Sequence, residues 1–258
     1  MSDFLLECGA LTRRWWIHFR RNLGSSIFGV FQPLMWLLLF GFAFKGVAAG
    51  RAEAFGTGDY IAFQTAGLLA IAVLGNTLFG GVPFLFDQES GFLDKMLVAP
   101  IARSALFVSR FVFVTAVSTV QALLILLLVA LLGVRVATGV GGLALIVVYT
   151  ALLAAGLTAI SIAMAFALRS HAAFFAITGF LMTPLLLVSS ALVPLDVMPA
   201  WLRVAAYLNP LTHGIEPMRY LVLGRGGASV LLTSGAALLA FDAAFVAIAI
   251  RTMRARME

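Results

Sequence analysis

The residues of this chain that could carry out catalysis are few and far apart. The three histidines lie in different predicted loops: His18, His171 and His213. Neither lysine follows a glycine, so no phosphate-binding P-loop can form: these are Lys45 and Lys95. No HExxH metal motif and no GxSxG nucleophile motif occurs, and Cys8 is the single cysteine. The sequence therefore predicts no catalytic residue, no metal site and no cofactor bound by this chain.

Asp242 is the one residue whose position hints at ion chemistry, because it interrupts an apolar run from Gly226 to Ile250. A carboxylate within a membrane is costly and is a candidate functional site. It could be the coupling carboxylate of an ion-driven transporter. A structural ion pair with a basic loop residue such as Arg169, or a water-facing position, is the interpretation that we favour. Neither a second buried carboxylate nor a pair of broken helices supports ion coupling.

Long uncharged stretches define the elements that hold these residues. Five of them exceed twenty residues, and the chain of 258 residues is 62% hydrophobic and only 11% charged. Because roughly 20 apolar residues of helix cross a bilayer core, we predict an all-α membrane protein with six transmembrane helices in one domain, 1–258. The predicted spans are 26–44, 60–84, 105–132, 143–168, 173–193 and 229–250.

The charge of the loops predicts the orientation. The net charge of +6 would suggest nucleic acid in a soluble protein, but the excess of arginine in cytoplasmic loops explains it better here, and we reject nucleic-acid binding. Eleven of the 17 basic residues lie in loops on the side of both termini and six lie on the other side. Both termini are therefore predicted to be cytoplasmic.

Two segments at that side are predicted to be amphipathic helices. In residues 1–25, apolar side chains recur at steps of three and four while the arginines lie mostly off that stripe, which is typical of an interfacial helix. In the loop 87–104, Phe92 with Met96 and Leu93 with Leu97 stack one helical turn apart, and Pro100 ends the helix. An ordinary solvated loop is the alternative for 87–104.

The segment 194–228 is too polar to span the membrane and too apolar for an ordinary loop. Pro199 could open a first short helix, and Asn209 followed by Pro210 is a good start for a second one, from 212 to 223. In the second helix Glu216 and Arg219 lie one turn apart. We predict two short re-entrant helices in the outer leaflet; a compact cap that only seals the bundle is the alternative.

Two runs resemble signatures of one transporter family. Glu89-Ser90-Gly91-Phe92-Leu93-Asp94-Lys95-Met96-Leu97-Val98-Ala99-Pro100, followed by Arg103, resembles the cytoplasmic loop of ABC-2 type exporter permeases, roughly E-x-G-x-(hydrophobic)-(acidic)-x-(hydrophobic)-L-x-(small)-P. Asn209-Pro210-Leu211-Thr212, with Glu216 and Arg219 after it, resembles the family's N-P-L-T…(acidic)-x-x-R signature. The resemblance covers nearly the whole chain and is nearest to the drug-resistance and nodulation-factor branch. Pro217 departs from it and could break the second external helix.

The resemblance implies a half-transporter in a bacterial plasma (inner) membrane. A second copy of this permease or a paralogue would pair with it among membrane lipids, and two separate ATP-binding subunits would hold ATP and Mg. The expected cargo is an amphipathic drug, lipid or lipid-linked molecule exported from the cytoplasm or inner leaflet. A polysaccharide or lipid-linked glycan is the alternative cargo, and ion coupling through Asp242 and a non-transporting scaffold are rival functions.

The resemblance also assigns roles to residues. The coupling helix that docks on the ATPase would use Glu89, Gly91, Phe92, Asp94, Lys95, Leu97, Pro100 and Arg103. The substrate pathway, between the second and fifth spans, would include Gln64, Asn76, Phe79, Phe174, Thr178 and Met182. The external lid would include Trp201, Asn209, Pro210, Glu216 and Arg219.

Overall fold

The computed structural model describes residues 2–21, 23–98, 102–168 and 170–257, and these residues form helices joined by short connections. In chain order the helices are α1 (Ser2–Arg21), α2 (Leu23–Ala43), α3 (Lys45–Gly50), α4 (Ala52–Phe55), α5 (Tyr60–Leu78), α6 (Val82–Glu89), α7 (Phe92–Val98), α8 (Arg103–Leu131), α9 (Gly139–Ala167), α10 (His171–Leu187), the 3-10 helix η1 (Leu195–Val197), α11 (Ala200–Tyr207), α12 (Pro210–Leu223) and α13 (Ser229–Met257).

Four helical stretches among the described residues are long and apolar enough to cross a membrane: Tyr60–Glu89, Ser104–Leu131, Gly139–Ala167 and Ser229–Met253. They coincide with the second, third, fourth and sixth predicted spans. Two shorter apolar helices, Phe31–Ala43 and His171–Leu187, fall where the first and fifth spans were predicted. The all-helical fold is thus confirmed over the described residues, with four candidate membrane spans, whereas the count of six spans stays a prediction.

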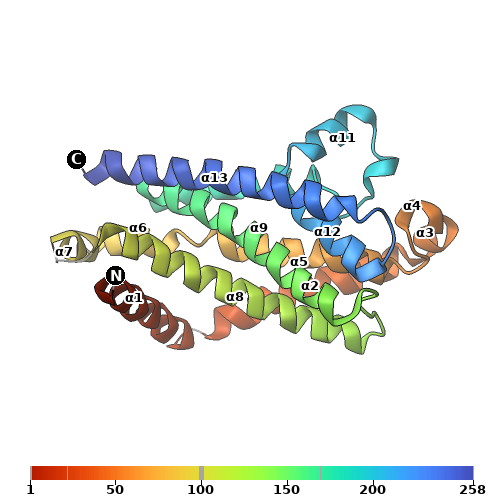
Figure 1. Cartoon of the computed structure of the whole chain (residues 1–258), viewed down its shortest axis with the longest axis horizontal. Coiled ribbons are helices and arrows are strands. Elements are labelled where there is room, and N and C mark those ends of the chain that lie inside the picture. The colour runs from red at the N-terminus through yellow and green to blue at the C-terminus, as the bar shows by residue number, and fades with distance from the viewer. Residues whose placement is uncertain (1, 22, 99–101, 169, 258) are drawn as a thin grey trace.

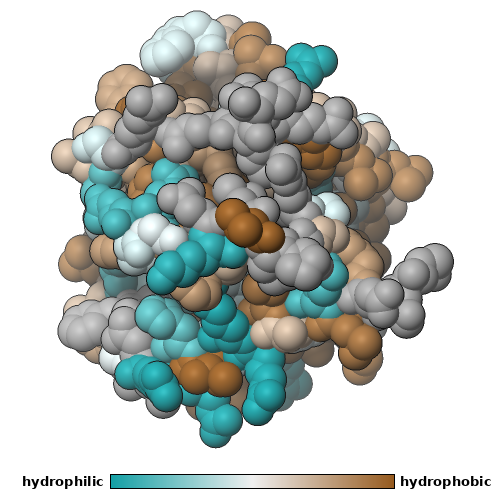
Figure 2. Space-filling view, turned by 90° about the vertical axis from the view of Figure 1, so that its left-hand side faces the viewer, coloured by the Kyte–Doolittle hydropathy of each residue, from teal (hydrophilic) through white to brown (hydrophobic). Residues whose placement is uncertain are grey.

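The two ends of the bundle differ in what they carry (Figure 1). Both chain termini, α1 and α7 lie at one end, which we name the terminus end. Helices α3, α4, α11 and α12 lie at the other, which we name the opposite end. The loop 87–104 therefore shares an end with the termini, as predicted, and Figure 2 looks onto this end, where hydrophilic side chains gather beside apolar ones.

Helix α5 is the centre of the bundle and packs against α2, α8, α9 and α12. Its leucines contribute to a continuous apolar core with α8, α9 and α12, and fully buried members of this core include Leu68, Leu69, Leu74, Ile125, Ile146, Leu153, Leu211 and Ile215. Helix α13 packs along α9 at the outside of the bundle, and only 11% of its most apolar window is buried. The remainder of α13 suits contact with lipid.

The predicted second span, 60–84, is not one continuous helix, because α5 ends at Leu78 and α6 begins at Val82. The hydroxyl of Ser161 in α9 bridges this break: Oγ accepts a hydrogen bond from the N–H of Gly81 at 2.9 Å and donates one to the carbonyl of Leu78 at 2.6 Å. A Cβ on Gly81 would lie 2.5 Å from the Ser161 carbonyl oxygen, so only glycine allows this approach. The break is therefore built in, with a helix from elsewhere in the chain satisfying its backbone groups.

The expectation that Pro217 breaks the second external helix was wrong, since α12 runs from Pro210 to Leu223 through it. Proline removes one backbone donor from a helix interior. Here the helix is buried against α5, α9 and α13, and Pro217 itself is buried. That tertiary packing offsets the single lost hydrogen bond.

Candidate functional site

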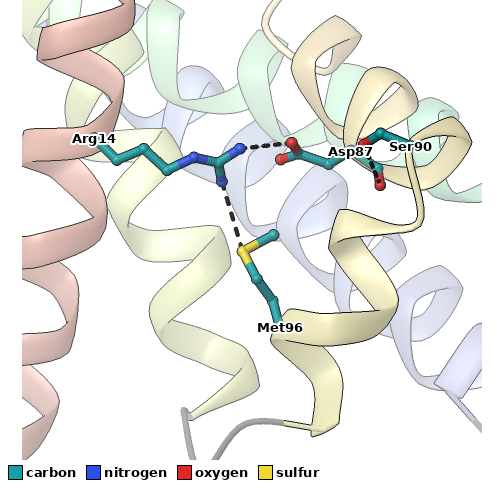
Figure 3. A network of polar contacts seen from close by, with 4 residues as sticks. All are labelled: Arg14, Asp87, Ser90 and Met96. Atoms are coloured by element: carbon teal, nitrogen blue, oxygen red, sulfur yellow. Dashed lines mark hydrogen bonds and ion pairs between the residues drawn. The ribbon is translucent and has the colours of Figure 1, made fainter.

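Arg14 joins the N-terminal helix to the predicted coupling segment (Figure 3). One guanidinium nitrogen donates to Oδ1 of Asp87 in α6 at 2.6 Å, and another lies 3.5 Å from the sulfur of Met96 in α7. The guanidinium also lies 4.4 Å from the ring centre of Phe92. A single side chain of α1 thus contacts both α6 and α7, and it ties the N-terminal helix to these two helices.

Trp15, the next residue of α1, contacts two guanidinium groups. Those of Arg14 and Arg110 are each 4.7 Å from the centre of its ring, and its edge packs on Phe84 of α6. Arg110 in α8 donates from Nε to the carbonyl of Gly80 at 2.7 Å. Arg110 therefore satisfies the remaining backbone carbonyl at the α5–α6 break and holds α8 against α1 and that break.

The short connection between α6 and α7 reverses the chain at Gly91, whose φ of +64° lies in the left-handed region that favours glycine. Helix α7 then buries Leu93 and Met96 against the bundle, while Phe92 and Lys95 stay exposed. The predicted short helix is confirmed, but the predicted shared face of Phe92 and Met96 is wrong, since Met96 is buried and Phe92 is exposed. Helix α7 ends at Val98; Pro100 lies outside the described residues, and of the side chains of Asp94, Leu97 and Arg103 nothing is described.

Glu89 connects the end of α6 to the start of α10. Its carboxylate lies 2.5 Å from Nδ1 of His171, and the imidazole contacts Phe86 in a tilted arrangement with 4.5 Å between ring centres. Glu89 remains 61% exposed in its side chain, so the pair lies at the surface of the terminus end. The loop that carries α7 is thus attached to α1 through Arg14 and to α10 through His171.

A cavity of about 790 Å³ opens between α1, α6, α8 and α10 at this end. Its lining residues are Arg14, Trp15, Ile17, His18, Arg21, Phe79, Val82, Pro83, Phe86, Asp87, Arg110 and Phe175. Three other cavities lined by described residues are smaller, at about 450, 230 and 130 Å³. It combines a basic wall from α1 and α8 with an apolar wall from α6 and α10.

At the opposite end, Arg219 of α12 is buried and fully engaged through its two terminal nitrogens. One donates to Glu216 and the other to the carbonyl of Ser190, both at 2.5 Å, and the guanidinium lies 4.0 Å from the ring centre of Phe63 in α5. The predicted pairing of Glu216 with Arg219 is confirmed. Arg219 fixes α12 to α5 and to the segment after α10.

Asn209 begins α12 as predicted. Its side-chain oxygen accepts from the N–H of Leu211 at 2.9 Å, and its side-chain nitrogen donates to the carbonyls of Leu185 and Val188. Pro210 follows at the first position of the helix and is buried. A single asparagine therefore caps α12 and also holds the end of α10, which the sequence pattern alone did not indicate.

Comparison with known proteins identifies the family of this chain. Residues 7–223 match the family described as ABC-2 type transporter. The chain belongs to the ABC-2 type transporter family. A putative transport permease, ycf38, of Cyanophora paradoxa is 35% identical over 84% of this chain and 74% of its own length. Nodulation protein J of Rhizobium leguminosarum bv. viciae is 27% identical over 88% of the chain and 86% of its own. The daunorubicin resistance ABC transporter permease DrrB1 of Streptomyces coeruleorubidus is 25% identical over 77% and 68%. The chain is therefore a transmembrane permease of an ABC transporter.

The residues predicted for this permease's substrate pathway do not share one cavity. Gln64, Phe174 and Thr178 are fully buried within the chain, and Met182 is half-buried beside the apolar core. Phe79 lines the large cavity and lies against Phe175 of α10. Asn76 lies elsewhere, hydrogen-bonded to Gln121 of α8. Of the six, Phe79 is the one placed at the large cavity, and the pathway role of all six stays a prediction.

The lid residues differ in exposure. Trp201 on α11 is 72% exposed at the opposite end, where an indole suits the headgroup level of a membrane. Asn209, Pro210 and Arg219 are buried and fix the helices. The dip of α11 and α12 into a leaflet stays a prediction.

Asp242 of α13 is half-buried and lies against the backbone of Gly156 in α9. Its expected ionic partner Arg169 lies outside the described residues. Among the residues that the structure describes, no ion pair of Asp242 is found.

Sequence reasoning missed four residues that organise the permease's terminus end: Arg14, Trp15, Arg110 and His171. Trp15 falls on the predicted apolar stripe of α1, and Arg110 is a lone charge that begins a long apolar run. Those two signals were visible. Their partners lie on helices distant in the chain, so their contacts required the folded structure.

Proposed function

We propose that this permease is the membrane half of an ATP-driven exporter and that separate ATP-binding subunits hydrolyse the ATP. Two copies of the chain, or one copy and a paralogue, would pair with two such subunits. The cargo would be an amphipathic molecule taken from the cytoplasm or the inner leaflet. The names of relatives linked to nodulation and daunorubicin resistance support an amphipathic cargo.

The position of α7 is the observation that carries this proposal. It is a short helix at the terminus end, with one face buried on the bundle and the other exposed through Phe92, Lys95 and Val98. An exposed helix face rimmed by charges is suited to bind another protein. The sequence holds no P-loop, so the energy source would come from that partner.

The contacts around α7 suggest how ATP-driven movement would reach the spans. A displacement of α7 would pull on Arg14 through Met96 and Asp87, and it would pull on α10 through Glu89 and His171. Two helices on either side of the cavity would then move together. The coupling would be a rigid-body movement, in which α7, α1 and α10 shift together because side-chain contacts connect them.

The first test is to purify the chain from its native membrane in mild detergent and identify its companions. A stoichiometric P-loop ATPase is the expected result. A chain that purifies without any ATPase, under conditions that preserve known complexes, would overturn the proposal.

A paired variant tests the role of α7 more directly. Changing both Glu89 and Asp94 to lysine should abolish assembly with the ATPase or uncouple its activity from export. Glu53→Lys is the matched control, because Glu53 is an exposed carboxylate at the opposite end. Unchanged assembly, ATPase activity and export in the double variant would contradict a coupling role.

The lone Cys8 tests the orientation. Burial, and then the charge of Glu7, raise the pKa of its thiol, so less thiolate is present at neutral pH than for an ordinary cysteine. In sealed spheroplasts a membrane-impermeant maleimide should label Cys8 only after the membrane is opened, faster at pH 8.5 than at pH 7. Labelling of intact spheroplasts would place the terminus end outside.

A lipid-linked glycan is the alternative cargo. Measuring which of the two cargo classes the reconstituted complex transports would distinguish them. Ion coupling is less well supported, since Asp242 lies against α9 and α13 is largely on the outside of the bundle. Loss of transport in Asp242→Asn, in the absence of any ATPase, would favour it.

A further inference from the structure

The cavity at the terminus end has two chemically different walls. One side carries the cationic side chains of α1 and α8, namely Arg14, His18, Arg21 and Arg110. The other side is aromatic and aliphatic and is formed by Phe79, Val82, Pro83, Phe86 and Phe175. A ligand that fills the cavity must therefore present charge to one side and hydrocarbon to the other.

The chain itself balances the charges on the basic wall only in part, because a single carboxylate, Asp87, acts on both Arg14 and Arg110. Asp87 is the one carboxylate in the lining, and its Oδ1 is held by Arg14 at 2.6 Å. Arg110 is only 8% exposed, and its one hydrogen bond among the described residues runs from Nε to a neutral backbone carbonyl. Arg21 and His18 are exposed at the rim of the cavity.

A buried guanidinium that shares its one nearby carboxylate with a second arginine is costly unless a further anion accompanies it. The guanidinium groups of Arg110 and Arg14 also each lie 4.7 Å from the centre of the Trp15 ring. Two cations facing one indole concentrate positive charge where an anion would relieve it.

We propose that this cavity binds the anionic headgroup of an amphiphile, a phosphate or a carboxylate, between Arg110 and Arg21. The hydrocarbon chain of that molecule lies along Phe79, Phe86 and Phe175. Basic pockets between membrane helices at the cytoplasmic side bind anionic lipid headgroups in this way. Helix α1, with its tryptophans and arginines, has the composition of a helix at headgroup depth, which places the basic wall at the level of such headgroups.

The headgroup chemistry fits two sources, the anionic lipid of the surrounding bilayer and an exported anionic amphiphile. The assignment as cargo rests on the proposed function, whereas binding itself does not.

Trp15 provides the measurement, because it lies in the wall of the cavity. The full-length chain with Trp16, Trp36 and Trp201 changed to phenylalanine keeps Trp15 as its one tryptophan. It is reconstituted into phosphatidylcholine vesicles that contain increasing fractions of phosphatidylglycerol with brominated chains, or of phosphatidylcholine with the same brominated chains. Quenching of Trp15 fluorescence against mole fraction reports occupancy of the cavity.

We expect half-maximal quenching at a severalfold lower fraction of brominated phosphatidylglycerol than of brominated phosphatidylcholine. Arg21→Gln and Arg110→Gln should each reduce this preference about fivefold, the factor expected for one basic residue at a membrane surface. Arg110→Lys should restore much of it. Arg251→Gln, an exposed arginine of α13 outside the cavity, should leave it unchanged.

Equal quenching by the two brominated lipids, or a preference that survives both Arg21→Gln and Arg110→Gln, would overturn the inference. Arg21 is exposed, so its variant is expected to fold even if Arg110→Gln does not. These outcomes leave the ATPase partnership untouched. Conversely, absence of a copurifying ATPase would refute the proposed function and leave the quenching result standing.

Addition of ATP to vesicles that also contain the partner ATPase separates the two sources. Recovery of Trp15 fluorescence as phosphatidylglycerol leaves the cavity during turnover identifies the anionic amphiphile as cargo. Quenching that is unchanged by turnover identifies a resident lipid of the bilayer.

Discussion

The two ends of the bundle each contain an arginine that is 8% exposed, yet these two arginines are held in opposite ways. Arg219 at the opposite end bonds a carboxylate, a carbonyl and an aromatic face that all come from its own chain. Arg110 at the terminus end has one neutral carbonyl, two aromatic rings and only a share of Asp87, whose Oδ1 bonds Arg14. The same residue at the same burial is thus a closed structural contact in one place and an open cationic site in the other.

The cavities beside the two arginines repeat the contrast. A cavity of about 450 Å³ next to Arg219 is lined by Glu53, Asp196 and Glu216 against Arg219 and Arg225, so its charges nearly cancel. The cavity next to Arg110 has three arginines against Asp87 alone. The difference indicates that the opposite end is built for rigidity, whereas the terminus end retains charge for a ligand.

Replacing each arginine with methionine is the sharpest way to break this comparison. Arg219→Met should cost about 3 kcal/mol of stability, because it leaves Glu216 without its partner in a largely buried place. Arg110→Met should cost about 1–2 kcal/mol, since it removes a hydrogen bond to Gly80 but also removes a buried charge that has only a shared carboxylate. The stability of both variants is measured in detergent as the temperature at which the monodisperse protein is lost.

The double variant Arg219→Met with Glu216→Gln serves as the control, and it should recover part of the loss. If Arg110→Met were as destabilising as Arg219→Met, the terminus end would be a structural contact of the same kind, and the contrast would fail.

Local sequence patterns were sufficient to predict several elements at the two ends of the bundle. The apolar stripe of α1, the short helix α7 and the Asn209–Pro210 start of α12 each depend on neighbours within a few residues. The pairing of Glu216 with Arg219 is also local. Such features follow from helical periodicity and capping, so the sequence predicts them without tertiary information.

The functional end could not be predicted in the same way. Arg14 and Asp87 are 73 residues apart, and the break between α5 and α6 is completed by Ser161 of α9, 80 residues beyond Gly81. Packing of helices distant in the chain decides these contacts, and a cavity formed by four helices has no signature in any one of them. Pro217 was misjudged for the same reason, since burial of α12 outweighs its local preference.

The Arg14–Asp87 pair tests whether the terminus end behaves as one unit. A double-mutant cycle with Arg14→Gln and Asp87→Asn should give a coupling free energy of about 1 kcal/mol, because Asp87 is mostly buried while Arg14 is partly exposed. Both single variants should also reduce the ATPase activity that export stimulates in the reconstituted complex. Additive stabilities, with normal coupling to the ATPase, would show that α1 and α6 act independently.

Gly91 tests the geometry of the coupling segment. Gly91→Ala forces a side chain into the left-handed region and should cost about 1–2 kcal/mol locally, displacing α7 from the bundle. Gly9→Ala is the matched control, since Gly9 is an exposed helical glycine with open space around it and should gain up to about 1 kcal/mol in helix propensity. Limited proteolysis between α6 and α8 measures the displacement. Equal protection of the two variants would show that α7 does not depend on this turn.

The smallest effect on stability is expected at Glu89 and His171, because a carboxylate–imidazole contact at the surface is worth at most about 1 kcal/mol even as an ion pair. The Glu89–His171 contact is expected to transmit movement from α7 to α10 rather than to stabilise the fold. Glu89→Gln, His171→Gln and the double variant should all unfold close to the wild-type temperature, yet each should reduce export-coupled ATPase activity.

If the pair transmits movement from α7 to α10, the double variant should be no worse than either single variant, because one missing contact already interrupts the path. If the ATPase activity of the double variant falls by the product of the two single reductions, Glu89 contacts the ATPase while His171 acts elsewhere. Unchanged activity in all three would leave Arg14 as the link between α7 and the spans, and would assign the open, cationic character of the terminus end to ligand binding alone.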